Sequence, residues 1–191
     1  MKYFILSICC LMVGFNSCSQ KPQKEKAAIL MEQLEILHRV DSIMLDNLPS
    51  TFEEYLLLWD TPACPLYNQE SIIEHLSYSH SIDYPLFVKK IVDISVEAKT
   101  GVDHVYCLKD VAMRLVEGRL QDVIIFLNGK TLEENLNFWT FVFSSLHDYP
   151  SEEYIATLSN RVKRIHSPRY IFPEALEQGY DNSKKSASIN H

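Results

Sequence analysis

Three pairs of adjacent glutamates are the residues of this chain best placed for acid–base chemistry: Glu53-Glu54, Glu133-Glu134 and Glu152-Glu153. Two carboxylates that flank the reacting bond of a substrate can serve as the general acid and the general base. Each pair, however, falls in the first turn of an expected helix, where carboxylates favour the positive helix end. Neighbours on a helix also point about 100° apart. We therefore expect these pairs to stabilise helix starts rather than to share a substrate.

The sequence gives little support for a metal-binding or nucleotide-binding site. Glu35 and His38 have the Glu-x-x-His spacing of carboxylate-bridged di-iron bundles, but such sites need the motif twice and it occurs once here. His75 and His80 are five residues apart, which separates them by about 140° on a helix. The chain has five glycines, no two within six positions, and this excludes glycine-rich phosphate loops. We expect no metal and no cofactor.

Nucleophilic catalysis is represented only by clusters of serine and histidine. The Gly-x-Ser-x-Gly pattern of many serine hydrolases is absent from the sequence. We expect a protein that is not an enzyme, and an unrecognised hydrolase using His80 or His147 is the alternative. The residues that would supply its nucleophile and base are Ser77, Ser79, Ser81, Ser144, Ser145 and Asp148, beside those histidines.

An aromatic group marks the segment that follows Thr131. Phe138, Trp139 and Phe141 spread apolar surface around much of the expected helix, which Phe143 extends. Either this helix is central and buried, or Phe138, Trp139 and Phe141 form an exposed interface, since aromatic residues are common interface anchors.

The elements that position these residues have helical period almost throughout. We expect an all-α fold, either an irregular antiparallel helical bundle or a short stack of helical hairpins, in one domain over residues 28–180 with a disordered tail at 181–191. Residues 123–127 are the best strand candidate, although a buried helix would have the same pattern. The expected helices span residues 30–48, 55–59, 68–80, 84–99, 103–117, 119–128, 131–148 and 151–166.

Capping signals support these boundaries. Thr51 and Thr131 each precede a glutamate by three residues, as in a capping box, Asp83 and Asp103 stand before further helices, and Ser151 follows a proline. Residues 51–59 and 131–139 also share Thr, Glu, Glu, Leu and Trp, through a duplicated helical unit or through convergence on the same capping chemistry.

The N-terminus has the layout of a signal peptide. Lys2 precedes an apolar run over residues 3–15, which is too short for a membrane-spanning helix of about 20 residues. The segment Phe15-Asn16-Ser17-Cys18 resembles the lipobox of bacterial lipoproteins. The resemblance implies a signal peptide at residues 1–17, lipidation of Cys18, a flexible tether at 18–27 and, with Ser19 following, an outer-membrane anchor that faces the periplasm.

Two cysteines remain after Cys18. In an oxidising compartment Cys64 and Cys107 are expected either to form a disulfide or to be buried. Sequence alone leaves both alternatives open, because a disulfide requires Cα atoms within about 7 Å.

The charge is unevenly distributed. Removing residues 1–17 takes away Lys2 alone among charged residues, which moves the net charge from −7 to −8. Between Ala28 and Asn160 there are 8 basic and 21 acidic residues, whereas Arg161, Lys163, Arg164 and Arg169 cluster behind them. An acidic body excludes a nucleic-acid partner and favours a basic protein partner, unless the charge serves solubility alone.

The segment Phe138-Trp139-Thr140-Phe141-Val142-Phe143, followed by His147, Asp148 and Pro150, is similar to segments of small helical bacterial proteins, some of which are encoded beside toxin or effector genes. The resemblance implies an immunity role. We therefore expect a noncatalytic, lipid-anchored periplasmic binding protein that neutralises a toxic enzyme. A structural or accessory envelope lipoprotein is the alternative, and the hydrolase is the second.

Overall fold

The computed structural model describes residues 41–59, 73–74, 76–80, 82–99, 105–144, 150–166 and 168–189. Helices dominate this part of the chain, and its strand-like pairing is limited to one isolated bridge between His166 and Arg169. The all-α prediction is confirmed. The helices are α2 (Asp41–Asn47), α3 (Phe52–Trp59), α5 (Tyr84–Glu97), α6 (Tyr106–Gly118), α7 (Leu120–Leu127), α8 (Leu132–Phe143), α9 (Glu152–Lys163) and α10 (Glu174–Ile189), and residues 73–74 and 76–78 are also helical.

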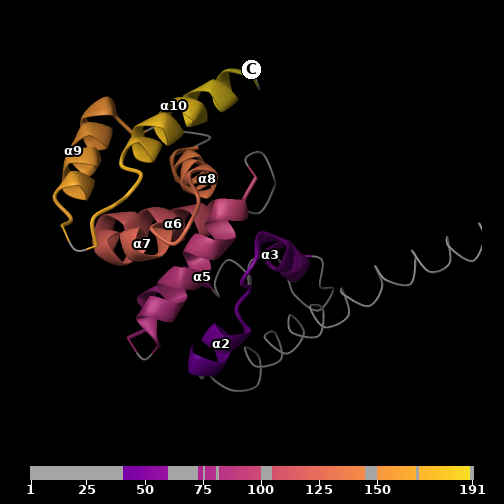
Figure 1. Ribbon diagram of the computed structural model, residues 1–191. Helices are drawn as coiled ribbons and strands as arrows, with labels where there is room; N and C mark the ends of the chain where they lie inside the picture. Colours follow the sequence, from indigo (N-terminus) through magenta and orange to yellow (C-terminus); the bar gives the residue numbers. More distant parts are fainter. Residues whose placement is uncertain are drawn as a thin grey trace, which may run out of the picture.

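Helix α8 lies at the centre of the bundle. It packs most extensively against α10 and then against α5, while α5 also contacts α3, α6 and α7. Figure 1 shows α2 and α3 on one side of α5, and α9 and α10 on the far side of α8. The two central helices therefore connect the N-terminal and C-terminal parts of the described chain.

Local sequence sets several helix starts as expected. The Thr131 hydroxyl accepts the backbone N–H of Glu134, and the Glu134 carboxylate accepts the N–H of Thr131 at 2.8 Å, which completes the expected capping box. Asp83 and Ser151 each accept the N–H three residues on, at 3.1 Å. Each cap satisfies an amide that the helix itself leaves without an acceptor.

Two polar contacts attach the N-terminal helices to α5. The buried Lys90 ammonium donates to the carbonyl of Leu48 at 2.5 Å and to that of Asp46 at 3.3 Å, beside the end of α2. The Glu97 carboxylate accepts the N–H of Phe52, the first residue of α3, at 2.9 Å. Lys90 of α5 thus contacts the negative end of α2, and Glu97 of α5 contacts the positive end of α3.

The largest differences from the expected boundaries concern the C-terminal half. Residues 123–127, the best strand candidate, belong to α7, and residues 181–189 continue α10. The expectation of a disordered tail is therefore wrong for 181–189. Gly179 and the fully buried Ser183 let α10 lie close to the core, a role that the polar composition of this segment conceals. Helix α6 begins at Tyr106, and Asp103 lies outside the described residues.

Candidate functional site

The aromatic residues of α8 belong to the core. Phe138, Trp139 and Phe141 are at most 1% exposed, and Trp139 packs edge-on to Phe138 with ring centroids 5.1 Å apart. The prediction of an interface at these three residues is therefore wrong, and the alternative of a central, buried helix is confirmed. The apolar surface extends around α8 because α5, α6 and α10 all pack against that helix.

A buried polar chain fixes α8 to the segment before α10. The Trp139 indole donates to the Tyr170 hydroxyl, which donates to the Asn135 side-chain carbonyl. The Asn135 amide nitrogen donates to the carbonyls of Leu127 at 3.0 Å and of Thr131 at 2.8 Å. Because every member has a partner, this network specifies packing rather than offering groups to a ligand.

The glutamate pairs contribute carboxylates to helix starts. The Glu54 carboxylate accepts the N–H of Ser50 at 2.8 Å, and the Glu134 carboxylate accepts that of Thr131. The backbone hydrogen bond from Thr131 lowers the pKa of Glu134, burial acts in the opposite direction, and the Thr131 hydroxyl and Lys130 add to the lowering. The Glu134 carboxylate thus completes the capping box predicted at Thr131, whereas the Glu54 carboxylate accepts the N–H of Ser50, one residue before Thr51.

The serine and histidine clusters are only partly described. His80 is exposed, and the Ser77 hydroxyl donates to the Glu74 carbonyl at 2.6 Å. Ser144 donates to the carbonyl of Phe141 at 2.8 Å, while Ser81, Ser145, His147 and Asp148 lie outside the described residues. His38 and His75 also lie outside, and within the described ranges His, Cys, Asp and Glu form no group of three that could hold a metal ion.

The lipidation and disulfide predictions involve residues outside the described part. Cys18 and Cys64 are both among them, and Cys107 is half-buried on α6, so the disulfide stays a prediction. Among the helices that the structure describes, none combines the length and the apolar character required to cross a bilayer.

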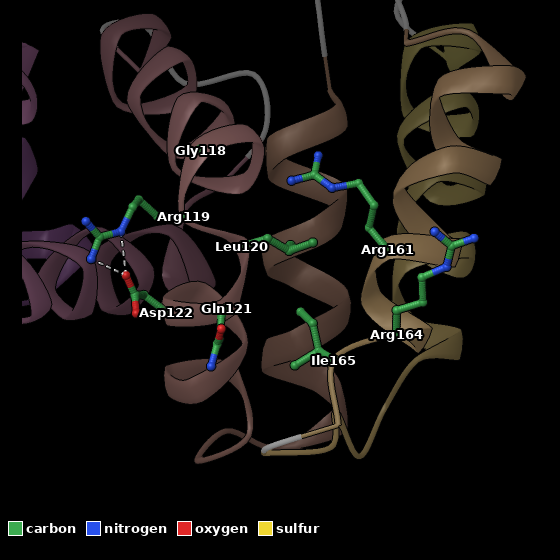
Figure 2. Close-up of a pocket in the computed structure, with 8 residues that line it drawn as sticks. All are labelled: Gly118, Arg119, Leu120, Gln121, Asp122, Arg161, Arg164 and Ile165. Atoms are coloured by element: carbon green, nitrogen blue, oxygen red, sulfur yellow. Dashed lines mark hydrogen bonds and ion pairs between the residues drawn. The ribbon is translucent and has the colours of Figure 1, made fainter.

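A hollow opens between the α6–α7 corner and α9, and we call it the α7–α9 hollow. It is lined by residues 118–122 and by Arg161, Arg164 and Ile165, and its volume is about 580 Å³ (Figure 2). The sharp turn between Gly118 and Leu120 forms one wall, because α6 ends and α7 begins with only Arg119 between them. The other wall is the last turn of α9.

Arg119 is held at one edge of the hollow. Its guanidinium pairs with Asp122, with Nε 2.6 Å from the carboxylate, and its Cζ lies 4.6 Å from the ring centroid of Tyr84 at the start of α5. The ion pair and the cation–π contact both orient this side chain. Arg119 therefore adds positive charge to the edge of the hollow, while its side chain is held in one position.

Arg161 and Arg164 occupy the α9 side. Arg161 extends toward the α6–α7 corner and donates from one terminal nitrogen to the Glu117 carbonyl at 2.8 Å, whereas Arg164 points away from α7 (Figure 2). A guanidinium has five N–H donors, so one bond leaves Arg161 with most of its capacity. Within the described residues the Arg164 guanidinium makes no hydrogen bond or ion pair.

The floor of the hollow is apolar. Leu120 is 6% exposed and Ile165 is half-buried, and Figure 2 shows both side chains between α7 and α9. Helix α7 also begins here without a side-chain cap, so its positive end adds to the charge of the arginines. An apolar floor with a basic rim can hold a small apolar group that carries, or lies next to, a negative charge.

No residue that lines this hollow was among the site residues expected from the sequence. The cluster of Arg161, Lys163, Arg164 and Arg169 was visible as a run of basic residues after an acidic body, but nothing connected it with Arg119, 42 positions before Arg161. The break between two helical patterns at Gly118-Arg119 is a sequence signal for this wall of the hollow. A tight corner between two helices places both helix ends at the surface.

No protein-family model, no curated protein and no solved structure matches this chain.

Proposed function

We propose that this chain is a noncatalytic binding protein, anchored in the outer membrane through a lipidated Cys18 and facing the periplasm, which neutralises a toxic enzyme by docking onto it. The α7–α9 hollow carries the docking part of this proposal. It combines arginines with apolar side chains, and protein interfaces are enriched in arginine and have apolar centres.

The charge of the body supports a partner that is basic overall. The chain carries a net charge of −7, and the lining of the hollow, with Arg119, Arg161 and Arg164 against Asp122, has the opposite sign. An acidic body accelerates encounter with a basic protein, while a local patch of opposite sign fixes how the two proteins align. The hollow would therefore select orientation rather than supply the long-range attraction.

Residue-specific crosslinking in the native cells tests the docking surface. A photoreactive amino acid at Gln121, an exposed residue of the hollow, should capture one dominant protein, whereas the same group at Gln178, exposed on α10, should not. The captured protein is then purified and its enzymatic activity measured with and without this chain. Stoichiometric inhibition supports an immunity role, and failure of the Gln121 probe to capture a protein contradicts docking at the hollow.

A partner without enzymatic activity would favour the structural or accessory lipoprotein instead. The anchor has its own test, which is mass spectrometry of the mature N-terminus with Cys18→Ala as the control. We expect acyl chains on Cys18, and an unmodified thiol would contradict the anchor.

A further inference from the structure

We propose that the α7–α9 hollow receives a carboxylate from a peptide segment of the partner, with an adjacent apolar side chain seated on Leu120 and Ile165. This inference rests on the proposed function, because it names the chemistry that the partner presents to the docking surface.

Arg161 provides the main contact. Its guanidinium spans from α9 toward the α6–α7 corner and uses one nitrogen for the Glu117 carbonyl. That bond holds the planar group in place, while the remaining N–H donors stay available at the opening. A guanidinium fixed in this way can bind a carboxylate through two parallel hydrogen bonds, which is a strong and directional contact.

The other charges of the hollow favour a single negative charge. Arg164 directly follows α9, three positions after Arg161, and is exposed and without an ion pair among the described residues, so its charge adds to that of Arg161. Asp122 offsets part of the positive charge through its pair with Arg119, and the Glu117 carbonyl marks the negative end of α6. Asp122 would repel a doubly charged phosphate more strongly than a singly charged carboxylate. A carboxylate also requires only one guanidinium for its two hydrogen bonds.

The shape of the surface favours a peptide over a membrane. The hollow is a concave space with Arg161 at its rim and the buried Leu120 at its floor, whereas a lipid surface contacts protruding residues. The chain is also acidic overall, which opposes approach to an anionic bilayer. A side chain such as leucine fits the space, and a neighbouring glutamate then lies within reach of the rim.

Nuclear magnetic resonance with short peptides tests this inference without the partner. The probes are acetyl-Leu-Glu-Leu-amide, the isosteric acetyl-Leu-Gln-Leu-amide, inorganic phosphate and vesicles of phosphatidylcholine with phosphatidylglycerol. We expect the glutamate peptide to shift the Arg161 Nε–H signal and the backbone amides of Leu120 and Gln121 at millimolar concentration. The glutamine peptide should bind at least tenfold more weakly, because it lacks the charge-assisted hydrogen bonds.

Variants localise the binding. Arg161→Gln should weaken the glutamate peptide at least tenfold, and Arg164→Gln should weaken it by a smaller factor. The matched control is Lys99→Gln. Lys99 is an exposed cation that lies beyond the last residue of α5, at the opposite end of this helix from Tyr84, whose ring contacts Arg119. This variant should leave binding unchanged. Thermal unfolding of each variant shows whether the bundle remains folded.

Equal binding of the two peptides, or unchanged binding to Arg161→Gln, would overturn the inference. Tighter binding of phosphate than of the glutamate peptide, or binding of the vesicles at the same residues, would also overturn it, in favour of a phosphate group or a lipid surface. If Gln121 still crosslinks to a protein while the glutamate peptide fails, docking at the hollow stands and the carboxylate assignment falls.

Discussion

The indole Nε1 of Trp139 donates a hydrogen bond of 3.0 Å to the hydroxyl of Tyr170, and both side chains are buried. Tyr170 lies four positions before the first residue of α10, and Trp139 lies near the centre of α8. This contact therefore connects the central helix to the segment that leads from α9 into α10. The position of α9 and of the hollow beside it depends on how that segment is held.

Replacing Tyr170 by phenylalanine should destabilise the bundle. The Trp139 N–H and the Asn135 carbonyl would both lose a buried partner, which costs about 1–3 kcal/mol in the free energy of unfolding. Urea denaturation measures this change. Tyr106→Phe serves as the control, because that side chain is exposed, and we expect it to change the free energy of unfolding by less than about 0.5 kcal/mol. Equal stability of both variants would show that the hydrogen-bond chain contributes nothing.

The same phenol should make stability fall at alkaline pH. Burial raises the pKa of Tyr170, the Glu174 carboxylate adds to this, and the hydrogen bond from Trp139 acts in the opposite direction. Above about pH 10 the unfolded chain loses the phenol proton while the folded chain keeps it. The free energy of unfolding therefore declines with rising pH, by up to about 1.4 kcal/mol per pH unit for one proton.

Urea unfolding at a series of pH values above 10 measures this slope. In Tyr170→Phe we expect a shallower decline than in the original chain, by the contribution of one proton. An unchanged slope would mean that Tyr170 ionises alike in the folded and unfolded chain.

Gly179 permits the close packing of α10 on α8. A Cβ atom at this position would lie 2.5 Å from the Cβ of Trp139 and 2.9 Å from the backbone nitrogen of Thr140. Gly179→Ala should therefore lower the free energy of unfolding by about 1–3 kcal/mol. Gly118→Ala is the matched control, since nothing lies within 4 Å of its Cβ position, and it should be neutral or stabilising by up to about 1 kcal/mol. Two substitutions of equal effect would contradict the packing of α10 on α8.

The local signals of helix starts could be predicted from the sequence. Thr131 with Glu134, Asp83 and Ser151 all cap helices because an oxygen of a short side chain before a helix accepts a backbone N–H that the helix leaves unpaired. Residues 123–127 were ambiguous because a run of five apolar residues is equally compatible with a strand and with a buried helix. Only tertiary packing determines that Val123 is buried and Ile125 is exposed.

The features that depend on distant residues could not be predicted. The polar segment after Tyr180 reads as a tail, and it becomes helical because Gly179 and Ser183 fit against the rest of the bundle. The hollow forms because the α6–α7 corner at Arg119 and the end of α9 at Arg161 line one space, and no periodicity in the sequence records that arrangement. The aromatic residues of α8 gave two alternatives because apolar character is common to cores and interfaces.

Association with the partner should slow as salt concentration rises. The chain carries a net charge of −7, and at physiological ionic strength salt screens its attraction to a basic protein at distances beyond about 8 Å. Stopped-flow measurement of the association rate constant at 50 and 500 mM sodium chloride tests this expectation. A rate constant that increases with salt would indicate an acidic partner and contradict the proposed charge complementarity.

The most direct test of docking at the hollow is the affinity of the purified partner for the double variant Arg161→Gln/Arg164→Gln, measured by titration calorimetry beside Lys99→Gln. We expect the double variant to raise the dissociation constant at least tenfold and the control to leave it within twofold of the original chain. An unchanged dissociation constant for a folded double variant would contradict the claim that the partner binds at the α7–α9 hollow.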